Sequence, residues 1–212
     1  MCWNSTSSLV SFITGYTICF ILFKRNQNYD RFYALCFFWI LLVQLLEYFM
    51  WKDQKCQKMN NISNQILCPV IFLQPIIISI LALNLTSMNK LNKNLLIIFT
   101  IISFIVFVGS YLTMKLWNKN LCSRPKDNEC HSLQWPWIKK DTNTLINSIN
   151  YFLLAFIVFY FLISTKNYYL IFFAVYLIFT LLISLFIKPF NESQYSHWCF
   201  LSVGLPLIKL FI

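Results

Sequence analysis

Residues 32–51 read FYALCFFWILLVQLLEYFMW, and this stretch decides the fold class. Its length matches the roughly 20 apolar residues that cross a bilayer as a helix. Two further stretches have the same character, LLIIFTIISFIVFVGSYLTM at 95–114 and YYLIFFAVYLIFTLLISLFI at 168–187. Charged residues make up 11% of the chain, whereas soluble domains carry about 25%. The sequence therefore predicts an all-α protein, a polytopic transmembrane helical bundle.

Apolar segments recur along the whole chain. The candidate helices are 8–23, 32–51, 66–85, 95–114, 145–163, 168–187 and 198–212. The apolar runs of the first and last are short, at about 15 residues, and reach only about 22 Å as helices. The last could instead re-enter the bundle from one side. We expect about seven helices, or six with a short C-terminal segment.

The one sizeable polar stretch is 115–144, KLWNKNLCSRPKDNECHSLQWPWIKKDTNT. Its prolines and polar residues predict a loop, so 1–212 is expected to be a single transmembrane domain with an extramembrane Cys- and Trp-rich loop. Tryptophan is enriched at membrane interfaces. We therefore interpret Trp135-Pro136-Trp137 as an interfacial anchor, with a binding cage as the alternative.

Alternating spans bring most cysteines to one side of the membrane. An even number of thiols there predicts disulfides, which persist in an oxidising compartment. The six candidates allow fifteen connectivities, and the alternative is that they are scattered small hydrophobic residues. The disulfide candidates are Cys2, Cys56, Cys68, Cys122, Cys130 and Cys199.

Orientation follows from the first helix. No Lys or Arg precedes it, whereas Lys24, Arg25 and Arg31 come just after it, so the N-terminus and the Cys-rich loops are expected to be extracellular or lumenal. Counting all basic residues gives the opposite side, because the Cys-rich side carries more of them. Sequons at Asn4, Asn61 and Asn191 agree with the first assignment. The N-terminal run lacks a basic segment before it, so we expect a retained helix rather than a signal peptide.

The charge balance predicts partners in the membrane. A net charge of +10 favours anionic lipid headgroups. No basic run is interleaved with aromatics on a soluble element, so nucleic acid is not expected. Membrane lipids and a small-molecule or lipid ligand are the predicted partners, and the sequence leaves the oligomeric state open.

One carboxylate, Glu47, lies inside an apolar run. On a helix it shares a stripe with Ile40, Gln44 and Trp51 at three- and four-residue steps. An intramembrane carboxylate is costly unless paired or hydrated, and such residues tend to mark function. Glu47 is therefore the leading candidate, although its side chain could also reach the headgroups.

Other polar residues fall in the same half of the membrane. Gln74 precedes Pro75, which predicts a helix kink, a freed carbonyl and an amide that needs a partner. We hypothesise a polar vestibule open to the cysteine side, in which Glu47 pairs with Lys188 or His197. Its residues are Gln44, Glu47, Gln74, Asn147, Asn150, Lys188 and His197.

The remaining motifs predict neither a metal nor a cofactor. The spacing Cys122-x7-Cys130-His131 lacks the close pairs of structural zinc sites. With three glycines the chain has no Gly-rich phosphate loop. Lys209 is interpreted as a snorkelling end anchor rather than a retinal-bearing lysine, because it lies three residues from the end of the sequence.

Three short motifs carry a resemblance. The start MCWN, the stretch QLLEYFMW with Gln44, Glu47 and Trp51, and LQP with Gln74 and Pro75 are similar to an uncharacterised family. Its members are small multipass membrane proteins of large DNA viruses of algae and amoebae. The resemblance covers roughly the first 85 residues. It implies a viral membrane protein, and it transfers no catalytic role to any residue.

Three function classes follow. The first is a ligand-binding or transport-like protein that uses the vestibule. The second is a structural or assembly protein of a viral or organelle membrane, in which polar groups join helices. The third is a lipid-modifying enzyme with Glu47 or His197 as general base. The inner half of the bundle is apolar, which argues against a continuous pore, and we favour binding or a structural role over catalysis.

Overall fold

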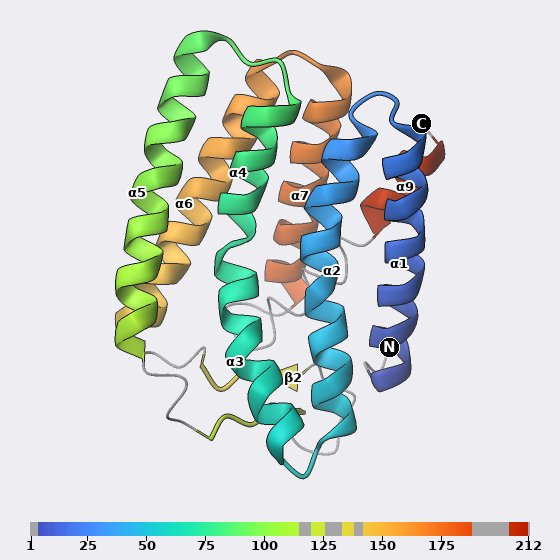
Figure 1. Ribbon diagram of the computed structural model, residues 1–212, viewed down its shortest axis with the longest axis vertical. Coiled ribbons are helices and arrows are strands. Elements are labelled where there is room, and N and C mark those ends of the chain that lie inside the picture. The colour runs from blue at the N-terminus through green and yellow to red at the C-terminus, as the bar shows by residue number, and fades with distance from the viewer. Residues whose placement is uncertain (1–3, 115–119, 126–132, 138–141, 188–203, 212) are drawn as a thin grey trace.

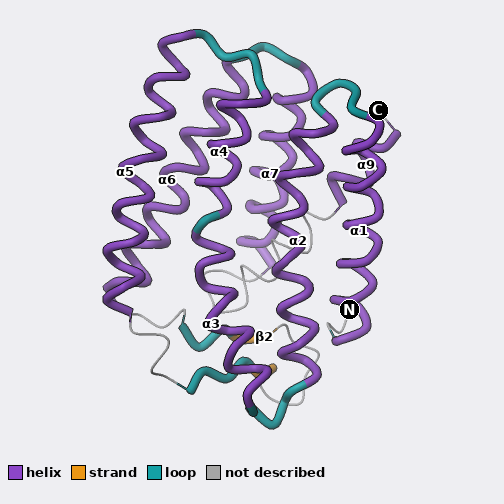
Figure 2. The backbone as a smooth tube through the Cα atoms, viewed as in Figure 1, coloured by secondary structure: helices purple, strands orange, loops and turns teal. Residues whose placement is uncertain are grey.

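The computed structural model describes residues 4–114, 120–125, 133–137, 142–187 and 204–211. The described helices are α1 (Ser5–Arg25), α2 (Asp30–Lys52), α3 (Lys58–Phe72), α4 (Gln74–Leu85), α5 (Lys90–Met114), α6 (Thr142–Ser164), α7 (Tyr168–Ile187) and α9 (Gly204–Phe211). Two-residue strands, β1 (Arg124–Pro125) and β2 (Leu133–Gln134), pair antiparallel. The predicted all-α bundle is confirmed, and α1 to α7 run along its long axis (Figures 1 and 2).

Most of the helices are compatible with an integral membrane protein. By length and composition α1, α2, α5 and α6 can each cross a bilayer, and the bent pair α3–α4 makes a fifth candidate. The apolar part of α7, Tyr168–Ile183, is shorter. The eight described residues of α9 reach only about 12 Å, less than a bilayer. The rest of the predicted segment 198–212 lies outside the described residues, so the choice between six and seven spans stays a prediction.

The predicted kink lies between α3 and α4, which are bent by 44° at Leu73. Pro75, in the first turn of α4, has no backbone N–H to continue the helix from α3. The groups near the break find partners on other helices. Trp39 Nε1 of α2 donates to the carbonyl of Val70 at 2.7 Å, and the Tyr151 hydroxyl of α6 donates to Gln74 Oε1 at 2.9 Å.

Two helices begin earlier than the apolar pattern predicts. The Asn4 side chain accepts a hydrogen bond from the N–H of Ser7 at 2.9 Å, and this cap extends α1 to 21 residues. Residues 58–65 were predicted to be a loop, but α3 begins at Lys58. The Asp53 carboxylate accepts hydrogen bonds from the N–H groups of Gln57 and Asn60, so a polar segment starts the helix.

The central element is α2. Its most apolar window is 61% buried, compared with 28% for α1 and α5. Gly15 of α1 lies against Leu41 of α2, and a Cβ there would meet Leu41 Cδ2 at 2.5 Å. One and two turns before Leu41, Phe37 and Tyr33 pack edge to face on Phe173 of α7, with ring centroids 6.0 and 5.1 Å apart. α2 therefore joins the N-terminal helix to the second half of the bundle.

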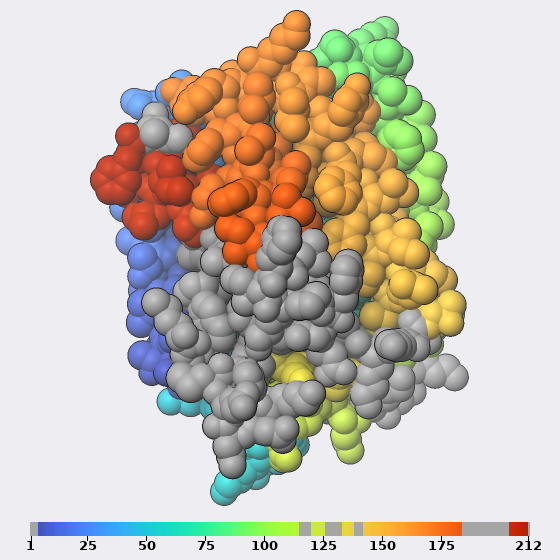
Figure 3. Space-filling view, turned by 180° about the vertical axis from the view of Figure 1, so that it is seen from behind, coloured from blue at the N-terminus to red at the C-terminus, as the bar shows by residue number. Residues whose placement is uncertain are grey.

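The C-terminal helix lies at the edge of the bundle, beside α7. In the view from behind, α6 and α7 form most of the upper face, and α9 flanks them (Figure 3). Gly204 begins α9, and a Cβ at that position would meet the hydroxyl of Tyr176 on α7 at 2.6 Å. α9 also contacts α1 and α2.

Candidate functional site

The intramembrane acid predicted from the sequence is buried in the bundle. Glu47 is 4% exposed and Gln44 1% exposed, and Gln44 Nε2 donates to Glu47 Oε2 at 3.3 Å. Ile40 and Phe37, one and two turns before Gln44 on the same helix, are also buried in the interior. The alternative in which Glu47 reaches the headgroups is therefore wrong.

Three other predicted vestibule residues connect neighbouring helices. Gln74 accepts from Tyr151 of α6, as described above. The Ser110 hydroxyl of α5 donates to Asn147 Oδ1, and Asn147 Nδ2 lies 3.5 Å from Met114 Sδ. Asn150 Nδ2 donates to the carbonyl of Ser103 on α5 at 2.9 Å. Gln74 thus joins α4 to α6, and both asparagines join α6 to α5.

Several predicted residues lie outside the described part of the chain. The pairing of Glu47 with Lys188 or His197 therefore stays a prediction. The same holds for disulfides of Cys2, Cys130 and Cys199.

One disulfide joins the α2–α3 turn to the long loop. Cys56 and Cys122 are bonded, with Cα atoms 5.3 Å apart and a separation of 66 positions in the sequence. Cys68 is instead a free, buried thiol of α3, like Cys19 and Cys36. Its predicted disulfide is wrong because its side chain packs in the core, away from solvent.

Asparagines of α3 hold the loop beside this disulfide. Asn60 is fully buried and donates to the carbonyls of Met50, Asp53 and Ser123 at 3.2, 2.9 and 3.0 Å. Its Oδ1 accepts from the N–H of Ser123 at 2.9 Å. Asn61, predicted as a sequon, accepts from the N–H of Leu121 at 2.9 Å. We call residues 53–57 and 120–125 the cysteine cap. It covers the C-terminal end of α2 and the N-terminal end of α3.

The two tryptophans of the long loop pack inside the protein. Trp135 is fully buried and Trp137 is 4% exposed, and their rings stack with centroids 5.5 Å apart. Trp137 also meets Phe72 of α3 edge to face at 5.6 Å. The Thr144 hydroxyl donates to the Trp137 carbonyl at 2.9 Å. The interfacial anchor predicted for them is therefore wrong, because both rings are buried inside the protein.

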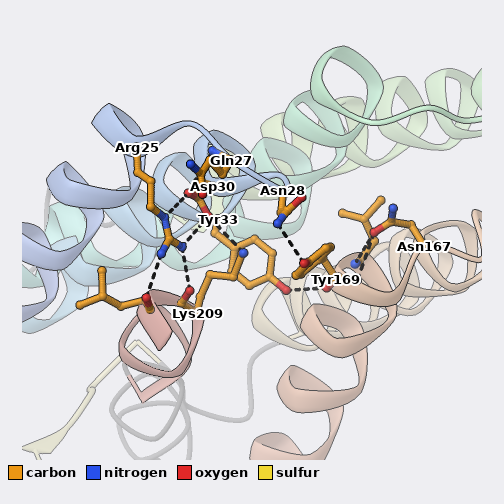
Figure 4. A network of polar contacts seen from close by, with 10 residues as sticks. Arg25, Gln27, Asn28, Asp30, Tyr33, Asn167, Tyr169 and Lys209 are labelled. Atoms are coloured by element: carbon orange, nitrogen blue, oxygen red, sulfur yellow. Dashed lines mark hydrogen bonds and ion pairs between the residues drawn. The ribbon is translucent and has the colours of Figure 1, made fainter. Parts of the chain in front are cut away.

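A cluster that the sequence did not predict lies at the opposite end of α2 (Figure 4). Asp30 is fully buried and accepts from Arg25 Nε at 2.6 Å and from Arg25 Nη2 at 3.1 Å. Lys209 Nζ lies 3.1 Å from Asp30 Oδ1, and the Lys209 side chain is also fully buried. We call Arg25, Asp30 and Lys209 the ionic cluster. Lys209 was predicted to snorkel, and this is wrong because its ammonium group points into the protein.

The ionic cluster also holds the backbone of the C-terminal helix. Arg25 Nη2 and Nη1 donate to the carbonyls of Lys209 and Leu210 at 2.9 and 2.8 Å. These carbonyls belong to the last turn of α9, where a cation also favours the helix dipole. Asp30 was assigned to a connecting loop, so its burial was missed. The available signal was an acid next to three basic residues in a short turn.

Within the described ranges, no three His, Cys, Asp or Glu side chains are grouped so that they could hold a metal ion. In comparisons with known proteins, the chain matches no family model, no curated protein and no solved structure. The resemblance to a viral family therefore stays a prediction, and the site must be interpreted from its own contacts.

Proposed function

We propose that this protein has a structural role in a membrane, as a helix bundle that is braced at both ends. The observation that carries this proposal is the use of Gln74, Asn147 and Asn150. The sequence predicts that they line a vestibule, but they bond one helix to another. Such bonds within a bilayer contribute about 0.6 kcal/mol on average. Several of them, distributed along α4, α5 and α6, hold these helices in one arrangement.

The two ends of α2 support the same role. At one end the cysteine cap fixes the α2–α3 turn through the Cys56–Cys122 disulfide. At the other end the ionic cluster fixes the α1–α2 turn and the docked α9. A protein that opens and closes for transport needs at least one mobile end, whereas both ends of this helix are held.

The disulfide also supports an orientation. Disulfides persist in oxidising compartments, so we place the cysteine cap on the extracellular or lumenal side and the ionic cluster on the cytoplasmic side. Lys24, Arg25 and Arg31, at the end with the ionic cluster, agree with the positive-inside rule. A viral or organelle membrane is the setting that the sequence resemblance favours.

Ligand binding at Glu47 is the second candidate. It is favoured by the burial of an acid on an interior stripe of α2, next to an amide that orients it. A ligand with a cationic or hydrogen-bond-donating group would suit this carboxylate. Catalysis by Glu47 or His197 remains a prediction. Neither the structural role nor ligand binding depends on it.

Native mass spectrometry of the protein purified in lipid nanodiscs separates the two candidates. If the role is structural, the mass measured after the nanodisc lipids are removed should equal that of the polypeptide alone, for both wild type and Glu47→Gln. A small molecule that is present at one copy in wild type and lost in Glu47→Gln would instead establish ligand binding. Asn150→Ala is the matched control, and it is expected to lower the melting temperature without changing the bound mass.

A further inference from the structure

Asp30 is held in place by partners other than Lys209 as well. Arg25 binds both of its carboxylate oxygens, and the N–H of Gln27 donates to Oδ2 at 3.1 Å. All three residues belong to α1, α2 or the turn between them. The carboxylate therefore retains these three hydrogen bonds when no ammonium group faces it.

Two tyrosine rings stand beside this carboxylate, and each is also fixed independently of Lys209 (Figure 4). The Tyr33 hydroxyl donates to the backbone carbonyl of Tyr169. The Tyr169 hydroxyl accepts from Asn28 Nδ2 at 2.9 Å. Asn167 Oδ1 accepts from the N–H of Tyr169 at 3.1 Å and so caps the start of α7. Both rings are thus oriented by contacts of their own.

The space between these groups holds an ammonium group. Lys209 Nζ lies 3.1 Å from Asp30 Oδ1 and 4.4 and 5.5 Å from the ring centroids of Tyr169 and Tyr33. A carboxylate together with aromatic faces is the arrangement by which proteins recognise alkylammonium ligands. We propose that Asp30, Tyr33 and Tyr169 form a binding site for a primary alkylammonium group, which we call the ammonium site, and that Lys209 is its internal ligand.

The ammonium site differs from a purely structural ion pair. An ion pair requires only opposite charges, whereas the two rings and the carboxylate select the shape of the cation. The backbone of α9 is held separately, since Arg25 binds the carbonyls of Lys209 and Leu210. Shortening the Lys209 side chain therefore leaves α9 docked and the ammonium site empty. An external amine of the same length would then enter it.

The test is chemical rescue of Lys209→Ala in the full-length protein in detergent. The missing atoms, Cγ, Cδ, Cε and Nζ, correspond to n-propylammonium. At 100 mM this cation is expected to raise the melting temperature of Lys209→Ala by about 4 °C, as expected for a weak ligand of a chain of this size. Sodium chloride at the same ionic strength and 1-propanol should give no such rise. Lys209→Met, which fills the space with an uncharged chain, and the exposed-site control Lys166→Ala should not respond to the amine.

Equal rescue by 1-propanol would overturn the proposal, as would a full response that persists in Asp30→Asn/Lys209→Ala. If Lys209→Ala does not fold without the amine, recovery of folded protein during purification with n-propylammonium, and not with 1-propanol, is the supporting result. If no condition yields folded Lys209→Ala protein, variants of Tyr169 provide the test. Tyr169→Leu should lower the melting temperature more than Tyr169→Phe, which keeps the ring, and an equal effect of the two would overturn the proposal.

Discussion

A carboxylate is buried near each end of α2, and the described contacts of the two carboxylates differ. Asp30 and Glu47 are 17 positions apart, which is about 25 Å along the helix. Asp30 meets cations from two other segments, α1 and α9. Glu47 meets the amide of Gln44 on its own helix. Asp30 therefore contributes to tertiary structure across the bundle, and the contact with Gln44 orients the Glu47 carboxylate.

The connections beside these two acids differ as well. At the Asp30 end, the segment between α1 and α2 is short and is held by ions and backbone carbonyls. At the other end, a disulfide and buried asparagines hold a long loop. Charge thus stabilises one end and covalent and amide bonds the other, so the two ends should respond to different perturbations.

The largest expected effect is at Asp30. Asp30→Ala leaves the buried Lys209 beside the partly exposed Arg25 without a counter-charge, and loss of one partner of a buried ion pair costs about 3–5 kcal/mol. We expect a lower free energy of unfolding in denaturant titrations of the protein in micelles. Asp53→Ala, at the opposite end of α2, is the control and should cost much less. Equal losses for the two would remove the contrast between the ends.

Removing the disulfide should have the next largest effect. Cys56→Ala/Cys122→Ala releases the loop from the α2–α3 turn and is expected to cost about 2–4 kcal/mol. Dithiothreitol should lower the stability of wild type by more than that of the double variant, which lacks this disulfide. Thiol labelling provides a second check, because the buried Cys68 should react only on unfolding. A reductant that does not alter wild-type stability would contradict the bracing role of the cysteine cap.

Two neighbouring asparagines of α3 that contact the cysteine cap should differ in their contribution to stability. Asn60 bonds three carbonyls and is fully buried, so Asn60→Ala leaves several groups unsatisfied and should cost about 2–3 kcal/mol. Asn61→Ala removes the bond to Leu121 and should cost about 1 kcal/mol. Thermal melts of both variants test this order. The reverse order would mean that Asn60 does not hold the loop.

The smallest effect is a pH dependence at the cysteine cap. The N–H groups of Asn60 and Gln57 donate to the Asp53 carboxylate and hold its pKa below the usual value. The folded state therefore binds this proton less readily than the unfolded chain. The stabilisation is fully present above a pH of about 4 and is lost as the pH falls through the lowered pKa. Melting temperatures measured from pH 6 down to 3 should fall less in Asp53→Asn than in wild type.

Much of the fold could be predicted because apolar length is a local property. The runs at 32–51, 95–114 and 168–187 correspond to α2, α5 and α7, and Pro75 fixed the bend before α4. The start of α3 was missed because its first residues are polar. Their burial depends on Ser123, which is distant in the sequence.

The candidate site was harder to predict. The burial of Glu47 followed from its place in an apolar run, and Cys56 and Cys122 were among the six cysteines expected to form disulfides. Asn147 and Asn150 were assigned to a vestibule because periodicity shows which residues share a face but not what that face meets. The structure places α5 against that face.

The sequence by itself determined a bundle of apolar helices, since the hydrophobic effect and backbone hydrogen bonding act on each segment alone. It also determined that one acid lies within the bilayer-length part of α2. Only the tertiary structure decided which charges meet, because Arg25 and Lys209 are separated by most of the chain and converge on Asp30. Buried polar groups need partners, and those partners are chosen by the packing of whole helices.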